Sequence, residues 1–182
     1  MIDIWIKVLP FLYTGIWGAQ NLFDPSIRTI GPTDSMVVGG LGDIVKAHTG
    51  QGDIEGAFTY AYGWNFLNLR PEATGIFTAN GDALIGVGLN DEYVFKGLSL
   101  MPDGSMPVFF SWSAGPSYYA PGRAPWGNSG PHLEFHLINE VGFYVNHAMR
   151  VSVSYTHYSS GGLTNQSNPN NNSILLNIGY RF

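Results

Sequence analysis

The last ten residues of the chain, 173–182, read Ser-Ile-Leu-Leu-Asn-Ile-Gly-Tyr-Arg-Phe, and this stretch decides the fold. Every second residue from Ile174 to Phe182 is large and apolar, and the alternate positions hold Leu175, Asn177, Gly179 and Arg181. A period of two residues is the repeat of a β-strand, in which successive side chains point to opposite faces. The end of the chain is therefore predicted to be a strand with one apolar face.

Two segments before it show the same alternation. In 149–159 the apolar positions are Met149, Val151, Val153 and Tyr155, opposite Arg150, Ser152, Ser154, Thr156 and Tyr158. In 133–146 they are Leu133, Phe135, Leu137, Val141, Phe143 and Val145, opposite Glu134, His136, Glu140, Tyr144 and Asn146. Because each segment keeps one parity over its whole length, each is predicted to be a strand with a single apolar face.

From Met36 onward, turn clusters such as Asn80-Gly81-Asp82 divide the chain into short segments without a helical period. The fold class is therefore all-β, with a single domain over residues 1–182. Eight strands are predicted: Met36 to Ala47, Asp53 to Phe66, Arg70 to Ala79, Ala83 to Val94, Met106 to Tyr118, Leu133 to Asn146, Met149 to Ser159 and Ser173 to Phe182.

The composition excludes several classes of protein. The 182 residues contain no cysteine, which rules out a disulfide scaffold, a thiolate metal site and a cysteine nucleophile. A net charge of −5 without a basic stripe argues against binding to nucleic acid. Only 12% of the residues are charged, about half the usual share, so something other than water is expected to face much of the surface. No run of apolar residues is long enough for a transmembrane helix.

Two architectures can use the alternation: a soluble lipocalin-like barrel with the apolar face inward, or a membrane barrel with that face toward lipid. The polar faces decide between them, because residues such as Ser152 and Ser154 are too small and neutral for a water-exposed exterior. A few charges on these faces are expected to pair inside a narrow lumen: Glu134, Glu140, Arg150 and Arg181. The sequence thus predicts an eight-stranded antiparallel transmembrane β-barrel of the outer-membrane type, with the soluble carrier as the alternative.

The N-terminal segment, residues 1–35, carries a weaker signal. Residues 4–18 are apolar apart from Lys7, and we consider a remnant of an export signal and an ordered strand or turn equally for residues 1–19. Residues 21–35, with Pro25 and Pro32, are predicted to form a loop.

His157 and Ser159 lie two positions apart, so both point to the same face of their strand. The parity of Val151 and Val153 makes that face the lipid-facing one. Polar side chains are costly there unless they lie at the membrane interface or have a function. The residues alone leave two alternatives: polar groups at the headgroup level, or a catalytic pair in which a histidine activates a serine.

The stretch from Leu69 to Phe182 resembles the lipid A 3-O-deacylase (PagL) family of outer-membrane esterases. The resemblance lies in an ordered set of short segments: Tyr155 to Leu163, containing His157-Tyr158-Ser159; Asn168-Pro169-Asn170; the final strand; and, upstream, Leu69 to Pro71, Asn80 to Leu84, Ser113 to Gly115 and Leu133 to Phe135. By this resemblance Ser159 is the nucleophile and His157 its general base, and they hydrolyse a 3-hydroxyacyl ester of lipid A on the outside of the barrel.

The chain departs from the family pattern at two places. Ser160 stands where the family has an asparagine that helps to hold the oxyanion, and Asn171 and Asn172 stand where the family has the glutamate that orients the histidine. An amide oxygen can fix the histidine tautomer but cannot balance the charge of the imidazolium. Reduced activity is therefore expected, and a catalytically silent structural or binding barrel of the same family is the alternative.

The resemblance implies localisation in the bacterial outer membrane, with lipid A or lipopolysaccharide of the outer leaflet and membrane lipids as partners. No cofactor and no metal are expected, because the remaining histidines show no spacing typical of a metal site: His48, His132, His136 and His147. Loop or lumen positions are predicted for them. The oligomeric state is left open, with a homodimer as one alternative.

Overall fold

The computed structural model describes residues 28–29, 34–45, 52–63, 69–122, 132–160 and 171–182. None of these residues forms a helix that could cross a membrane.

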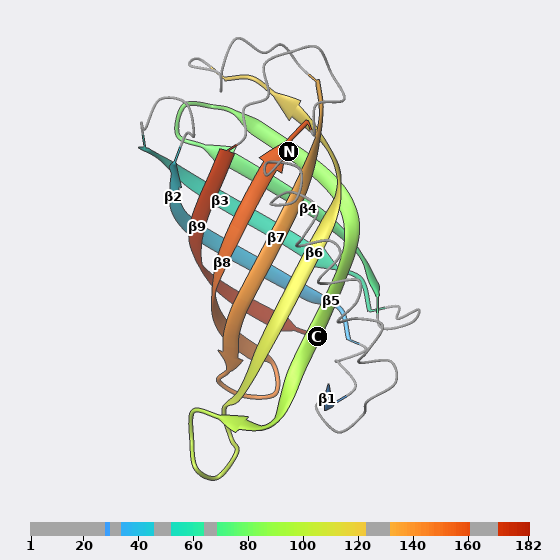
Figure 1. Cartoon of the computed structure of the whole chain (residues 1–182), viewed down its shortest axis with the longest axis vertical. Helices are drawn as coiled ribbons and strands as arrows, with labels where there is room; N and C mark the ends of the chain where they lie inside the picture. Colours follow the sequence, from blue (N-terminus) through green and yellow to red (C-terminus); the bar gives the residue numbers. More distant parts are fainter. Residues whose placement is uncertain (1–27, 30–33, 46–51, 64–68, 123–131, 161–170) are drawn as a thin grey trace, which may run out of the picture.

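Eight antiparallel strands close into a barrel (Figure 1). Each strand pairs with the strands before and after it in sequence, and β2 pairs with β9 to close the ring. The bounds are β2 Met36–Val45, β3 Gly52–Ala61, β4 Arg70–Thr78, β5 Ala83–Ser99, β6 Pro107–Ala120, β7 His132–Tyr144, β8 Met149–Ser159 and β9 Asn171–Arg181. All eight predicted strands are present, and the all-β barrel prediction is confirmed.

The largest difference in length concerns the hairpin of β5 and β6, which was predicted to end at Val94 and resume at Met106. The ladder instead continues to Ser99, with a register shift between Val94 and Ser99. Gly97 and Gly104 adopt φ angles of 76° and 79°, which glycine alone adopts readily, and they allow the irregular strand and its tight turn. The hairpin consequently extends past the neighbouring strands (Figure 1).

The N-terminal segment contains one short element where a loop was predicted. The two residues of β1, Arg28–Thr29, pair with Phe95 and Val94 of β5. Since β4 pairs with β5 only as far as Asn90, this edge of β5 is free to accept another strand. The export remnant or ordered element considered for residues 1–19, and the position of His48, lie outside the described residues.

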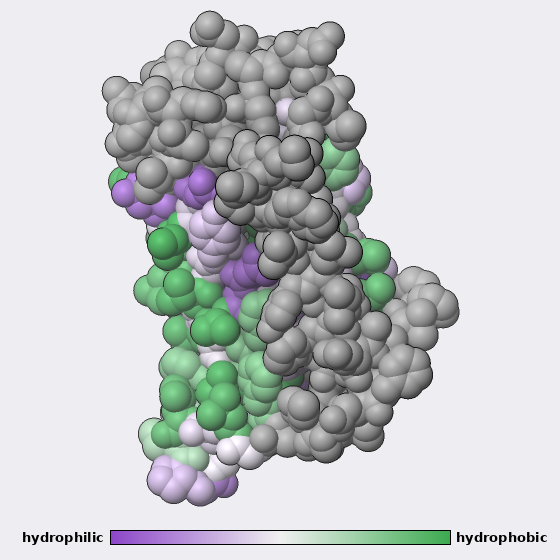
Figure 2. All heavy atoms as spheres, viewed as in Figure 1, coloured by the Kyte–Doolittle hydropathy of each residue, from purple (hydrophilic) through white to green (hydrophobic). Residues whose placement is uncertain are grey.

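The outer wall of the barrel is apolar, which rejects the soluble lipocalin-like alternative. Leu176 on β9 is 63% exposed and Val153 on β8 is 51% exposed, whereas Ser152 and Asn177 on the same strands are buried inside. Figure 2 shows hydrophobic residues over much of the visible described wall. Such a surface is stable against lipid but not against water.

The charged side chains of the lumen form a network around Arg150, as was expected of this residue and Glu140. The Arg150 guanidinium donates to Glu140 Oε2 at 2.7 Å and also to the Glu92 carboxylate. Arg70 donates to Glu92 at 3.4 Å, so that two arginines balance two glutamates. Gly179 makes room for the arginine, because a Cβ there would lie 2.8 Å from the Arg150 side chain.

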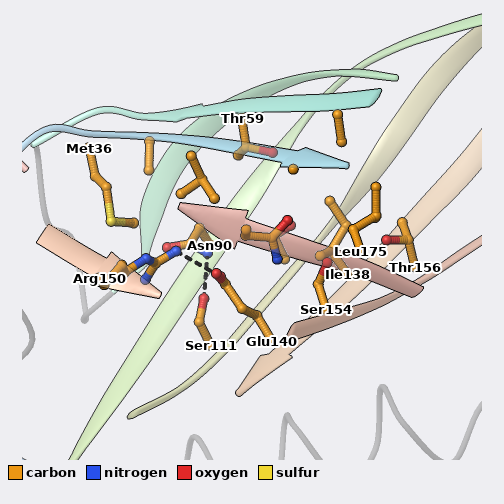
Figure 3. A pocket seen from close by; sticks show the side chains of 16 residues that line it. Met36, Thr59, Asn90, Ser111, Ile138, Glu140, Arg150, Ser154, Thr156 and Leu175 are labelled. Atoms are coloured by element: carbon orange, nitrogen blue, oxygen red, sulfur yellow. Dashed lines mark hydrogen bonds and ion pairs between the residues drawn. The ribbon is translucent and has the colours of Figure 1, made fainter. Parts of the chain in front are cut away.

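Above this network the lumen is nearly filled. Ile76, Leu84, Tyr119 and Tyr158 pack as a buried cluster. A cavity of about 30 Å³ remains beside Arg150 and Glu140, which Figure 3 shows together with Asn90 bonded to Ser111. This volume holds about two water molecules, which agrees with an eight-stranded barrel whose interior is only wide enough for side chains.

Two of the predicted lumenal charges lie elsewhere than in this network. Glu134 is fully buried on β7, as its parity predicted. Arg181, near the end of β9, was expected to pair inside the lumen, but it is partly exposed, lies 3.7 Å from Asp34 and donates to the His147 carbonyl. Arg181 is the last residue of β9, so it lies at the rim of the barrel, where solvent and loop carbonyls are available.

Removing the Arg150 side chain leaves Glu140 buried without its ion-pair partner and leaves Glu92 with Arg70 alone. We expect Arg150→Met to lower the free energy of unfolding by about 3–5 kcal/mol. Arg181→Met is the control, because an exposed pair contributes less than about 1 kcal/mol. Urea titration of the protein in lipid vesicles, followed by tryptophan fluorescence, measures both. Equal midpoints for the two variants would contradict the central role of the buried network.

Candidate active site

Three polar side chains lie on the outward parity of β8 near its end: Tyr155, His157 and Ser159. The alternation of the strand carries Thr156 and Tyr158 to the lumen, where both are buried. The wall therefore presents a phenol, an imidazole and a hydroxyl in a row within an otherwise apolar surface. This is the face on which the sequence placed His157 and Ser159.

His157 makes two hydrogen bonds, one through each nitrogen of its ring. Its Nε2 is 3.2 Å from Ser159 Oγ, and its Nδ1 is 2.8 Å from Asn172 Oδ1. An amide oxygen only accepts, so the bond to Asn172 requires the hydrogen on Nδ1. Nε2 is then left with a lone pair facing Ser159, which is the arrangement in which an imidazole removes a proton from a serine.

The position of Asn172 follows from the register of β9. The strand was predicted to begin at Ser173, with Asn171 and Asn172 in the preceding loop, but it begins at Asn171. Although asparagine is unfavourable in strands, the ladder continues because Asn172 pairs with His157 on β8 and with Val45 on β2. Asn171 pairs with Tyr158 and so lies on the opposite, lumenal parity. Of the two candidate residues, Asn172 is the one that pairs with His157 across the ladder, and its side chain contacts the histidine.

Tyr155 belongs to the same cluster and was not among the predicted site residues. Its hydroxyl donates to Asn172 Oδ1 at 2.6 Å, so one amide oxygen accepts from both Tyr155 and His157. The signal that could have found it is parity, since residues 155, 157 and 159 share one face. The alternation of the strand predicts Tyr155 to be part of the apolar wall, and the residue is 45% exposed.

The two serines at the end of β8 are more enclosed than their place on the wall suggests. Ser159 is 8% exposed and Ser160, which follows the strand, is 1% exposed. Phe135 of β7 pairs with Ser159 and Leu137 pairs with His157, so apolar residues border the pair on that side. The hydroxyl of Ser159 therefore lies in a partly desolvated environment, where electrostatic interactions are stronger than in water.

A second serine–histidine arrangement lies inside the barrel. Ser117 Oγ is 2.6 Å from His136 Nδ1, and His136 Nε2 is 3.0 Å from Glu72 Oε1. Ser117 is 3% exposed, and a Cβ at Gly86 would lie 2.4 Å from its hydroxyl oxygen, so no substrate has room to approach. This trio fills the lumen, in agreement with the lumen position predicted for His136.

The described part of the chain holds no group of three or more histidine or acidic side chains placed to bind a metal ion.

The sequence profile of the family described as lipid A 3-O-deacylase (PagL) matches residues 49–181. The fold is similar to that in the crystal structure of the outer membrane enzyme PagL, with a TM-score of 0.57 and 19% identity, covering 79% of this chain and 97% of that one.

Two other solved structures are similar in fold alone. Neisserial surface protein A (NspA) has a TM-score of 0.52 and 10% identity, covering 81% of this chain and 96% of its own. A de novo designed transmembrane β-barrel has a TM-score of 0.51 and 11% identity, covering 86% and 100%. No curated protein matches the sequence.

The geometry of the cluster predicts the tautomer of His157. Nitrogen-15 NMR of the histidine-labelled protein in detergent micelles, at a pH at which the ring is neutral, should show the hydrogen on Nδ1. Asn172→Ala removes the acceptor, and the populations of the two tautomers should then become mixed. A ring that carries its hydrogen on Nε2 in the unaltered protein would contradict the arrangement.

Proposed function

The chain belongs to the lipid A 3-O-deacylase (PagL) family and is an outer-membrane β-barrel, and we propose that it is an esterase that removes a 3-hydroxyacyl chain from lipid A. The observation that carries the proposal is the line of contacts from Ser159 Oγ through His157 to Asn172 Oδ1 on the outer wall. A membrane barrel has no structural need for such a line on its lipid-facing side.

In the proposed reaction Ser159 Oγ attacks the carbonyl carbon of the acyl ester while His157 Nε2 takes the hydroxyl proton. Collapse of the tetrahedral intermediate breaks the bond to the sugar oxygen, and His157 returns the proton to that oxygen. Water then hydrolyses the acyl-serine by the same steps. Ser160, next to the nucleophile, is proposed to donate one hydrogen bond to the oxyanion, a contribution worth on the order of 100-fold or more in rate in other enzymes.

The position of the site on the barrel suits a lipid substrate. The longest connections between strands, residues 121–131 and 160–170, are at the end of the barrel where β8 ends at Ser159. Outer-membrane barrels have their longer loops outside the cell, so we expect Ser159 to lie at the level of the outer leaflet. An acyl ester there reaches the hydroxyl from the side, and its chain lies against exposed wall residues such as Leu133 and Tyr118.

Asn172 is proposed to replace the family's glutamate as the residue that orients His157. Its oxygen is in place to hold the Nδ1–H tautomer, as an asparagine does in Cys-His-Asn enzymes. It carries no charge, so it does not stabilise the imidazolium that forms when Ser159 loses its proton. Turnover slower than that of a serine–histidine–carboxylate site follows from this difference.

Mass spectrometry of lipid A tests the proposal. Expression of the protein in outer membranes should produce lipid A that lacks one hydroxyacyl group, and Ser159→Ala should abolish this product because it removes the hydroxyl that His157 Nε2 contacts. Ser152→Ala, a lumenal change on the same strand, is the control and should retain the product. An unchanged lipid A spectrum at high expression would instead identify a catalytically silent barrel, and retained activity in Ser159→Ala would exclude this serine as the nucleophile.

The role of Asn172 predicts that a substitution can raise the rate of deacylation. Asn172→Asp puts a carboxylate of the same shape against His157 Nδ1, and we expect the rate of deacylation to rise by about 10-fold to 100-fold. Asn171→Asp adds the same charge one residue away on the lumenal parity and should not raise the rate. Initial rates on purified lipid A in detergent compare the two variants. Equal effects would show that the local charge, and not orientation of His157, is responsible.

A further inference from the structure

The outer cluster has a counterpart on the inner face of the same two strands. Tyr158 lies between His157 and Ser159 in sequence, and Ser173 follows Asn172, but both point into the lumen. There the Tyr158 hydroxyl and the Ser173 hydroxyl each donate to the same atom, Glu55 Oε1, at 2.9 Å. One carboxylate oxygen of β3 thus joins β8 to β9 directly behind the site.

The Glu55 side chain reaches β8 and β9 across β2, the strand that lies between β3 and β9. It is fully buried on β3, and its partner on β2 is Gly42, which has no side chain to separate it from β9. Its other oxygen, Oε2, has no hydrogen-bond partner among the described residues. Burying a carboxylate is costly, and among the described residues no ion pair of Glu55 offsets that cost.

From this arrangement we propose that Glu55 is a positioning residue for the outer site. By holding Tyr158 and Ser173, it fixes the backbone of β8 and β9 where His157 and Asn172 face each other. Reacting groups must be held within a fraction of an ångström, and a displacement of about 1 Å can cost about 100-fold in rate. The proposal rests on the proposed function only in taking His157 and Ser159 as the reacting pair.

Two variants of Glu55 separate the effect of its hydrogen bonds from the effect of its charge. Glu55→Gln keeps an acceptor oxygen for both hydroxyls, and its amide nitrogen takes the place of Oε2 without displacing a bond. Glu55→Leu removes the acceptor but fills similar space. Positioning predicts that the first variant retains function and that the second loses it.

The readout is the rate at which a fluorophosphonate probe labels Ser159, because labelling needs an activated serine but not lipid A. Heat-modifiable gel mobility confirms that each variant is folded. We expect Glu55→Leu to label at least about 10-fold more slowly and Glu55→Gln to stay within about 3-fold of the unaltered protein. Glu140→Leu, which removes a lumenal carboxylate bonded to Ser152 lower on β8, should lower stability and leave the labelling rate unchanged.

Labelling of Glu55→Leu at the normal rate would overturn the proposal, and so would equal slowing in Glu55→Gln. If Glu55→Leu does not fold, Tyr158→Phe and Ser173→Ala remove the two donors singly; unchanged labelling in both would also overturn it. Failure of the proposed function appears differently, as labelled Ser159 with intact lipid A. If the unaltered protein is not labelled, the nitrogen-15 resonances of the His157 ring test the positioning role instead. The same resonances in Glu55→Leu as in the unaltered protein would refute that role.

Discussion

The hydrogen bonds of the polypeptide backbone are the constraint on which the rest of this structure depends. In hydrocarbon no water is available to an unpaired N–H or C=O group, so the strands must pair without leaving an edge. The pairing of β2 with β9 meets this requirement and closes the ring. With eight strands the interior is only wide enough for side chains, which is why the inner face is filled by Tyr158, Tyr119 and the arginine–glutamate network.

Closure also puts the two faces of each strand in two different environments, the lipid outside and the lumen inside. The outward positions meet lipid and are apolar, whereas the inward positions must pair their charges with one another. In one half of the lumen, Arg150 forms ion pairs with Glu92 and Glu140. On the outer wall, a polar group has to find its partner within the wall itself, and the shared oxygen of Asn172 provides this for Tyr155 and His157.

The strands and their faces could be predicted from sequence because the alternation is a local property and survives in each segment separately. The bounds could not, because they depend on neighbours: Asn171 is in a strand since Tyr158 is there to pair with it, although its own preference is for a turn. His157 and Ser159 were found by their spacing. The contact between His157 and Asn172 joins residues 15 positions apart, and it needed the register of β8 against β9.

The lumenal trio of Ser117, His136 and Glu72 shows how little interatomic distance alone says about catalysis. It contains the acid that the outer cluster lacks, and its spacings match those of a hydrolase at least as well. A geometric template of a serine, a histidine and a carboxylate would therefore select the trio that no ester can reach and overlook the pair that faces the lipid. In a β-barrel, the side of the wall on which a group lies is as much a part of its chemistry as the identity of its neighbours.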